Sequence, residues 1–166
     1  YVGVNHALGL VGGLLSSQAY PNSGLWFMIF PAVALILIGI VRSSPRQSLG
    51  VGFAAGLAWY ASQIPWMTAY LGPTPWLALS TLEALIFAAG AYLLNVAYLF
   101  FKRGQHTMWS NTLLSLSVAS LWTAREWVAS NWPYGGFGWA RVITGFAESP
   151  LRFLATLFGI TGAGFV

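Results

Sequence analysis

Six apolar runs separated by short polar connectors set the strongest limit on how this chain can fold. The runs cover residues 2–20, 25–41, 49–69, 76–101, 108–128 and 151–166. A helix that crosses a bilayer needs about 20 apolar residues, and the third and fifth runs have that length. The fourth run is slightly long, which favours a tilted helix. The first two runs are short and close together, which favours a helical hairpin.

The scarcity of charge decides the class of protein that these runs build. Charged residues make up 6% of the chain and hydrophobic residues 57%, whereas a soluble domain carries about 25% charged residues. The apolar runs are too long for barrel strands and do not alternate with polar residues. We therefore expect an all-α integral membrane protein, with a bundle of about six transmembrane helices.

Several functional classes find no support in the residues. The net charge of +4 comes from a few scattered basic residues, which is unlike a nucleic-acid-binding surface. The chain has no cysteine, so it holds no disulfide, thiolate metal site or cysteine nucleophile. His6 and His106 are isolated, and neither belongs to a cluster that suits a metal. No Ser–His–Asp set or phosphate-binding loop is present either. We predict no catalytic residue, metal or cofactor in this chain.

Basic connectors predict the orientation in the membrane. Arg42 and Arg46 lie between the second and third runs, and Lys102 and Arg103 lie between the fourth and fifth. By parity both connectors lie on one side, and the positive-inside rule places that side in the cytoplasm. We expect a multi-pass protein of the bacterial cytoplasmic membrane with a cytoplasmic N-terminus.

The opposite, outer side is rich in tryptophan and includes a long connector at residues 129–149. Six tryptophans lie at or near the outer ends of the runs: Trp26, Trp66, Trp76, Trp127, Trp132 and Trp139. Tryptophan often anchors helices at membrane interfaces. The excess on one side also suggests a cavity that contacts lipid. Because residues 129–149 combine glycines, prolines and aromatic side chains, we expect a re-entrant or interfacial loop.

The few ionisable residues at the outer side and within the runs need partners. Glu83, deep in the fourth run, should face the bundle interior. Arg125 and Glu126 are consecutive, so their side chains diverge by about 100° on a helix and should not pair with each other. We expect the loop to provide the partners, with Arg141 reaching Glu126 and Glu148 reaching Arg125. An alternative is that the positive charges near this loop bind an anionic group.

Small residues predict where two helices approach closely. Gly52 and Gly56 form a small-xxx-small pair at the start of the third run, and such pairs allow close helix packing in membranes. The sixth run also has small residues that favour close packing, with three glycines near its end.

Several of these segments, taken together in order, resemble the membrane domain of bacterial apolipoprotein N-acyltransferases, and more narrowly the actinobacterial branch. The segments are Tyr20–Pro21, Gly50–Gly56, Ile64–Trp66, Leu71–Trp76, Glu126–Trp127, Gly135–Trp139, Gly145 and Pro150–Leu151. The chain departs from the family pattern at Gly138, where proline is usual, and at Ala129–Ser130, where an arginine often follows the Glu-Trp pair.

The resemblance implies a role in lipoprotein biosynthesis. Such enzymes transfer an acyl chain from a phospholipid to the N-terminal cysteine of a diacylglyceryl lipoprotein, through a thioester on a cysteine of a nitrilase-like domain. The chain begins at Tyr1 and ends within an apolar run, so we expect a fragment truncated before that domain. The resemblance implies that Trp66, Glu126, Trp127, Trp139 and Gly145 line the site that holds both lipid substrates.

Two other functions stay open at this point. The same helices could anchor a polyprenol monophosphomannose synthase through the basic connectors at residues 42–47 and 102–106. A small transporter that uses Glu83 as an intramembrane ionisable site is less favoured, because no inverted repeat is visible and Glu83 is the only deep acid.

Overall fold

The computed structural model describes residues 2–20, 23–104 and 107–165, and this part of the chain is helical with no strand. Pro21 and His106 lie outside the described residues. The α-helices are α1 (Val2–Ser16), α2 (Ile29–Val41), α3 (Pro45–Gln63), α4 (Met67–Leu71), α5 (Pro73–Lys102), α6 (Met108–Ala129) and α7 (Phe153–Phe165). Four short 3₁₀ turns lie between them: η1 (Ser17–Ala19), η2 (Trp26–Met28), η3 (Val142–Phe146) and η4 (Pro150–Arg152).

Local sequence signals determine where the longer helices begin. Ser44 caps α3 by accepting from the Gln47 N–H, while the Gln47 side chain accepts from the Ser44 N–H. Pro45 follows at the first helical position, where its missing N–H costs nothing. Thr107 and Ser110 form the same reciprocal cap at the start of α6. Both caps satisfy backbone donors that a helix start leaves open.

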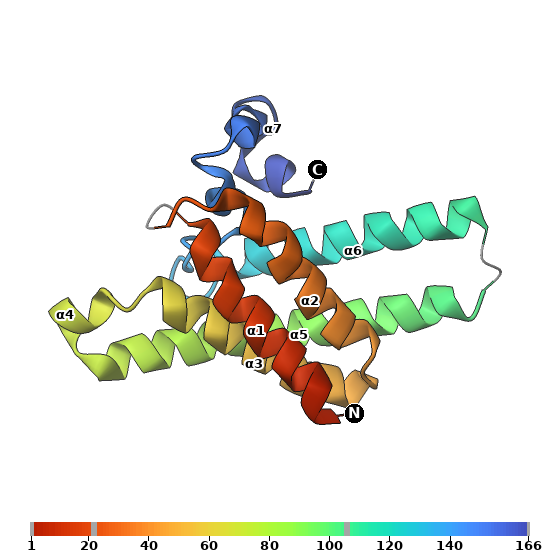
Figure 1. The fold of residues 1–166 in the computed structure, drawn as a ribbon, viewed down its shortest axis with the longest axis horizontal. Coiled ribbons are helices and arrows are strands. Elements are labelled where there is room, and N and C mark those ends of the chain that lie inside the picture. The colour runs from red at the N-terminus through yellow and green to blue at the C-terminus, as the bar shows by residue number, and fades with distance from the viewer. Residues whose placement is uncertain (1, 21–22, 105–106, 166) are drawn as a thin grey trace.

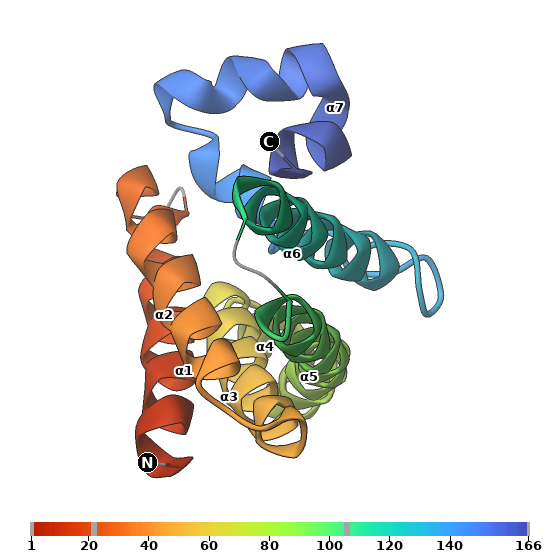
Figure 2. The same ribbon diagram turned by 90° about the vertical axis from the view of Figure 1, so that its right-hand side faces the viewer.

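Two apolar runs are not continuous helices. The run at 49–69 is divided, because α3 ends at Gln63 and the short helix α4 begins at Met67. Pro65 explains the break, since the residue before a proline avoids helical geometry. The run at 151–166 forms η4 and α7, and α7 is kinked at Gly159, whose φ of 68° is left-handed. The second of these bends folds α7 back over α6 (Figure 2).

Helix α3 lies between α1 and α5, and its contact with α5 depends on two glycines. A Cβ on Gly52 would collide with Ala91, and one on Gly56 would lie 2.6 Å from the Phe87 Cβ. Only glycine therefore fits at these two crossings, as the small-xxx-small pattern predicts. Next to Gly56, the α3–α5 interface continues with Trp59 and Phe87, each 1% exposed.

The connectors gather by type at two ends of the helices. The α2–α3 connector, the end of α5 and the start of α6 lie at the same end of the bundle as the start of α1 (Figure 1), and Arg42, Arg46, Lys102 and Arg103 belong to this end. At the other end lie α4, the η1–η2 region and the loop that follows α6. The structure therefore separates a basic end from a tryptophan-rich end.

Within the described residues, one helix is long and apolar enough to cross a membrane, namely α5 with 30 residues. Two shorter apolar helices, Trp26–Val41 and Pro150–Phe165, fall below spanning length. Helices α3 and α6 have 19 and 22 residues, but their small and polar side chains make them less apolar. The fold is thus all-helical and consistent with a helical membrane domain.

Candidate functional site

A cavity of about 490 Å³ opens at the tryptophan-rich end, between the end of α3 and the loop after α6. Its lining residues come from four segments of the chain: Tyr20, Gln63, Trp66, Gly138, Trp139, Thr144 and Ala147. The Trp66 and Trp139 rings lie 6.2 Å apart between centroids and tilt by 60°. This cavity, called the Trp66–Trp139 pocket below, has the size of ordinary small-molecule sites.

One buried side-chain donor in the wall of this pocket has no partner among the described residues. Gln63 is 8% exposed, and its Nε2 donates no hydrogen bond there. A buried donor without an acceptor costs about 1–3 kcal/mol. Tyr20 and Thr144 are satisfied within the protein, since the Tyr20 hydroxyl donates to the Arg141 carbonyl at 2.9 Å and Thr144 donates to the Trp139 carbonyl at 3.0 Å. The Gln63 Nε2 is therefore the buried donor of this wall that has no acceptor among the described residues.

Glu126 holds the loop behind this pocket. One carboxylate oxygen, Oε1, accepts from the Trp122 indole at 3.0 Å and from the Val142 backbone N–H at 2.9 Å. Glu126 is 5% exposed, and the bond to Val142 fixes the start of η3 against α6. Its contacts are to the protein itself, so Glu126 positions the loop that carries Trp139.

The expectation that Arg125 and Glu126 do not pair was wrong. Arg125 Nη2 lies 3.4 Å from Glu126 Oε1, and both side chains are buried. The central carbon of the Arg125 guanidinium lies 4.2 Å from the centre of the Phe87 ring and 4.8 Å from the centre of the Trp122 ring. Consecutive residues do diverge at Cβ, but the long arginine side chain lies along these rings and its end returns to the carboxylate.

The expected partners from the loop are also absent among the described residues. Arg141 does not reach Glu126, because it donates to the Ser130 hydroxyl at 2.7 Å and to the Thr161 hydroxyl at 3.2 Å. Glu148 does not reach Arg125 either, since it is exposed and its carboxylate lies beside Gly24. Arg141, half-buried and close to Gly138 in the pocket wall, thus has no carboxylate partner in this part of the chain.

The five residues that the sequence analysis proposed for lipid binding lie in four kinds of place. Trp66 and Trp139 line the pocket, and Glu126 lies behind it. Trp127 is 55% exposed and does not line the cavity, while Gly145 is buried against Ala19 and Ile29. The pocket residues that the sequence did not nominate include Tyr20 and Thr144, and their only visible signal was a hydroxyl beside an apolar run.

The chain is similar to known proteins over the segments that form this site. The family described as "Apolipoprotein N-acyltransferase N-terminal domain" matches residues 12–166. The chain belongs to this family. Its members include enzymes, because the curated relatives that match this chain are described as apolipoprotein N-acyltransferases.

Two relatives show how much of the full enzymes this chain represents. The apolipoprotein N-acyltransferase of Mycolicibacterium smegmatis is 36% identical over 85 residues, which cover 48% of this chain and 14% of that protein. The one from Geobacter metallireducens is 29% identical over 167 residues, which cover 98% of this chain and 31% of that protein. The chain thus spans less than a third of these relatives. Their names do not support the interpretation as an anchor for a polyprenol monophosphomannose synthase.

Proposed function

We propose that this chain is the membrane part of an apolipoprotein N-acyltransferase. Its tryptophan-rich end would hold the lipid substrates at the outer face of the cytoplasmic membrane. The donor would be a phospholipid and the acceptor a diacylglyceryl lipoprotein, whose N-terminal cysteine receives the acyl chain. The thioester would form on a cysteine outside these residues, because this chain has none. Holding two membrane-bound reactants in a fixed geometry is itself a large contribution to rate.

The observation that carries the proposal is the unpaired Gln63 amide in the wall of the Trp66–Trp139 pocket. A lipid ester carbonyl or phosphate oxygen is an acceptor that would satisfy this donor. The two tryptophans offer apolar faces to the glycerol and the first methylenes of the acyl chains. This combination suits the boundary between headgroup and hydrocarbon, where aromatic belts lie.

Arg141 supports the same assignment from the loop side. Its guanidinium lies near Gly138 in the pocket wall, held by two hydroxyls and by no carboxylate among the described residues. Arginine pairs well with phosphate, because its donors match the spacing of phosphate oxygens. We assign Arg141 to the phosphate of the donor lipid, while Glu126 positions the loop.

The test is acyl transfer by the full-length protein in phospholipid vesicles, followed by mass spectrometry of a diacylglyceryl lipopeptide. Trp66→Ala and Trp139→Ala should each lower kcat/KM by at least about tenfold, since truncating a tryptophan that a bound ligand covers costs about 2 kcal/mol or more. Trp132→Ala is the matched control, because Trp132 is in the same loop as Trp139 and is similarly exposed (61% against 56%) but lies outside the pocket. Full activity of both pocket variants at normal expression would contradict the proposed site.

Gln63 separates a substrate-binding role from a structural one. Gln63→Leu removes the donor but keeps the bulk of the side chain, and it relieves the cost of a buried unpaired group in the empty protein. We expect unchanged or higher thermal stability together with a raised KM for the lipid substrate. A variant that lost stability while its KM stayed constant would assign Gln63 to the fold.

A further inference from the structure

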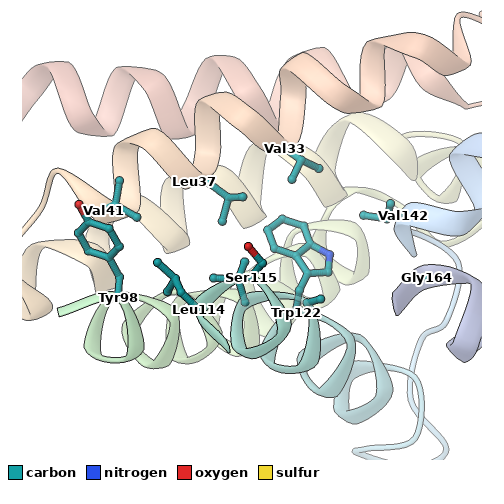
Figure 3. A pocket seen from close by; sticks show the side chains of 11 residues that line it. Val33, Leu37, Val41, Tyr98, Leu114, Ser115, Trp122, Val142 and Gly164 are labelled. Carbon is teal, nitrogen blue, oxygen red and sulfur yellow. The ribbon is translucent and has the colours of Figure 1, made fainter. Parts of the chain in front are cut away.

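A second cavity of about 450 Å³ lies on the side of the bundle, where α2 faces α5 and α6 (Figure 3). Its walls are almost wholly apolar. Val33, Leu37 and Val41 of α2 point toward Leu114 and Trp122 of α6, with Tyr98 of α5 at one end (Figure 3). The cavity, called the lateral groove below, opens between the helices because α2 and α6 make almost no direct contact.

A polar cavity of about 430 Å³ continues the lateral groove at the basic end of the bundle. The two cavities share Val41 and Tyr98 as lining residues. Beyond these, the polar cavity is lined by Val4, Asn5, Arg42 and Lys102. None of the three glutamates of the chain, all of which the structure describes, lines either cavity. We call this polar cavity the basic pocket.

The fold fixes the backbone around the basic pocket, while the Arg42 and Lys102 side chains are exposed at its rim. Asn5 is 5% exposed and donates to the Arg42 carbonyl at 3.2 Å and to the Ser43 hydroxyl at 3.1 Å, which fixes the turn that carries Arg42. Lys102 Nζ lies 5.9 Å from the centre of the Tyr98 ring. Arg42 and Lys102 thus both lie where the basic pocket and the lateral groove meet, since the two cavities share Val41 and Tyr98.

The length of the lateral groove suits the depth of one membrane leaflet. Its lining on α2 extends from Val33 to Val41, which is about 12 Å at a rise of 1.5 Å per residue. One leaflet of hydrocarbon is about 15 Å deep, half the thickness of the bilayer core. An acyl chain that enters at the basic end would therefore be covered over most of the depth of one leaflet, and the far end of the groove reaches Val142 of η3 and Gly164 of α7.

We propose that the lateral groove and the basic pocket together bind one anionic phospholipid from the leaflet at the basic end of the protein. Arg42 and Lys102 hold the phosphate headgroup, and one acyl chain lies in the lateral groove between α2 and α6. Basic pockets between transmembrane helices are typical sites for anionic lipid headgroups. This lipid is not the substrate: α5 separates Lys102 from Trp76, beside the Trp66–Trp139 end, by about 39 Å at 1.5 Å per residue.

Charge selects a lipid over another protein segment as the occupant. A transmembrane helix would cover the apolar walls, but it would leave Arg42 and Lys102 without a counter-ion. A phospholipid matches both halves at once, with a negative headgroup beside the cations and a hydrocarbon chain beside the apolar walls. The bound chain would also fill the gap that α2 and α6 leave, so it would help to position α6.

The headgroup is tested by native mass spectrometry of the delipidated full-length protein, titrated with dioleoyl phosphatidylglycerol or dioleoyl phosphatidylcholine. Arg42→Gln and Lys102→Gln should each weaken phosphatidylglycerol binding about fivefold, because one cation near an anionic lipid is worth about 1 kcal/mol. Arg46→Gln and Arg103→Gln make the same charge change outside both cavities. They should change binding by less than about twofold, through the screened long-range field alone.

The acyl chain is tested by filling the lateral groove. Leu37→Trp places a large ring where the acyl chain would lie. It should weaken the binding of both lipids by at least about tenfold. Leu116→Trp is the matched control, because Leu116 is on α6, 47% exposed and outside the groove. It should bind both lipids like the wild type.

Three results would overturn the proposal. The first is equal loss of phosphatidylglycerol binding in the pocket variants and in the Arg46 and Arg103 controls, which would reduce the effect to net charge. The second is unchanged binding in Leu37→Trp. The third is a wild-type protein that binds neither lipid, because another segment of the full-length chain would then fill the groove. Acyl-transfer activity is measured separately, so the proposed function can fail or hold independently of these results.

Discussion

Helix α5 meets its two neighbours, α3 and α6, in different ways. Against α3 the backbones nearly touch, since a Cβ on Gly56 would lie 2.9 Å from the Ala84 Cα. Against α6 the Arg125 side chain lies between the helices, where it packs against the Phe87 ring and Gly90 of α5. Figure 2 shows α3 beside α5 and α6 farther out, away from α2.

The difference shows how residue size sets helix spacing in an apolar protein. Where both surfaces are small, the helices close completely and leave no room for solvent or lipid. Where bulky residues face one another without a complementary small surface, as between α2 and α6, a groove remains. The position of α6 therefore depends on a few side chains around one buried ion pair, and the position of α3 depends on backbone contact along a whole helix face.

Breaking the Arg125–Glu126 pair should have the largest effect on this contrast. Arg125→Ala leaves a buried carboxylate without its cation and removes the contacts with Phe87 and Trp122. Loss of one partner of a buried pair costs about 3–5 kcal/mol, and we expect about 3 because Trp122 and Val142 still donate to Glu126. The measurement is the free energy of unfolding in an SDS titration of the full-length protein.

A second variant shows whether charge or shape holds α6. The double substitution Arg125→Met with Glu126→Gln removes both charges and keeps most of the volume, so it should recover most of the lost free energy of unfolding. If the double variant were as unstable as Arg125→Ala, the stacking of the guanidinium on the two rings would be the larger contribution.

A larger side chain in the α3–α5 contact should have the second-largest effect on the free energy of unfolding. Gly56→Leu forces a side chain into the Phe87 Cβ and the Ala84 backbone, which should lower the free energy of unfolding by about 2 kcal/mol. Gly3→Leu is the control, because a Cβ at Gly3 has no neighbour within 4 Å. A Gly56 variant as stable as this control would mean that α3 and α5 can move apart at little cost.

Substitutions at two alanines compare the closed α3–α5 contact with the wall of the lateral groove directly. Ala91→Leu fills the closed α3–α5 contact, where Ala91 is 0% exposed, and should cost about 1.5 kcal/mol. Ala119→Leu adds the same atoms to the wall of the lateral groove and should change the free energy of unfolding by less than about 0.5 kcal/mol. Equal costs at the two positions would mean that the groove is filled by protein in the full-length molecule.

The sequence predicted the parts of this fold that depend on regular spacing. The hydrophobic runs located the helices, and Gly52 with Gly56 located the closest crossing. The break after Gln63 was readable in principle, because Pro65 lies inside the third run, but the run was apolar on both sides and hid the boundary. A short apolar segment carries no period that distinguishes one long helix from two.

The site was less predictable, because its residues meet through loop geometry. Trp66 and Trp139 are 73 positions apart, and only the path of residues 129–149 brings their rings together. The prediction of the ion-pair partners was wrong for a similar reason. The angle between consecutive residues described where Arg125 and Glu126 leave the helix, while the rings beneath the arginine decide where its guanidinium ends. Spacing rules describe Cβ positions well and the ends of long side chains poorly.

Gly145 gives the smallest expected effect and the sharpest test of a residue that resemblance alone nominated. It is buried, yet a Cβ there would meet Ala19 and Ile29 at 3.5 Å, which is ordinary van der Waals contact. Gly145→Ala should therefore shift the free energy of unfolding by less than about 0.5 kcal/mol and leave acyl transfer unchanged. A clear loss of transfer in a stable variant would show that an occupant approaches the backbone here. The substrate site would then extend beyond the Trp66–Trp139 pocket toward η2, and glycine would serve lipid contact at this end as it serves helix contact between α3 and α5.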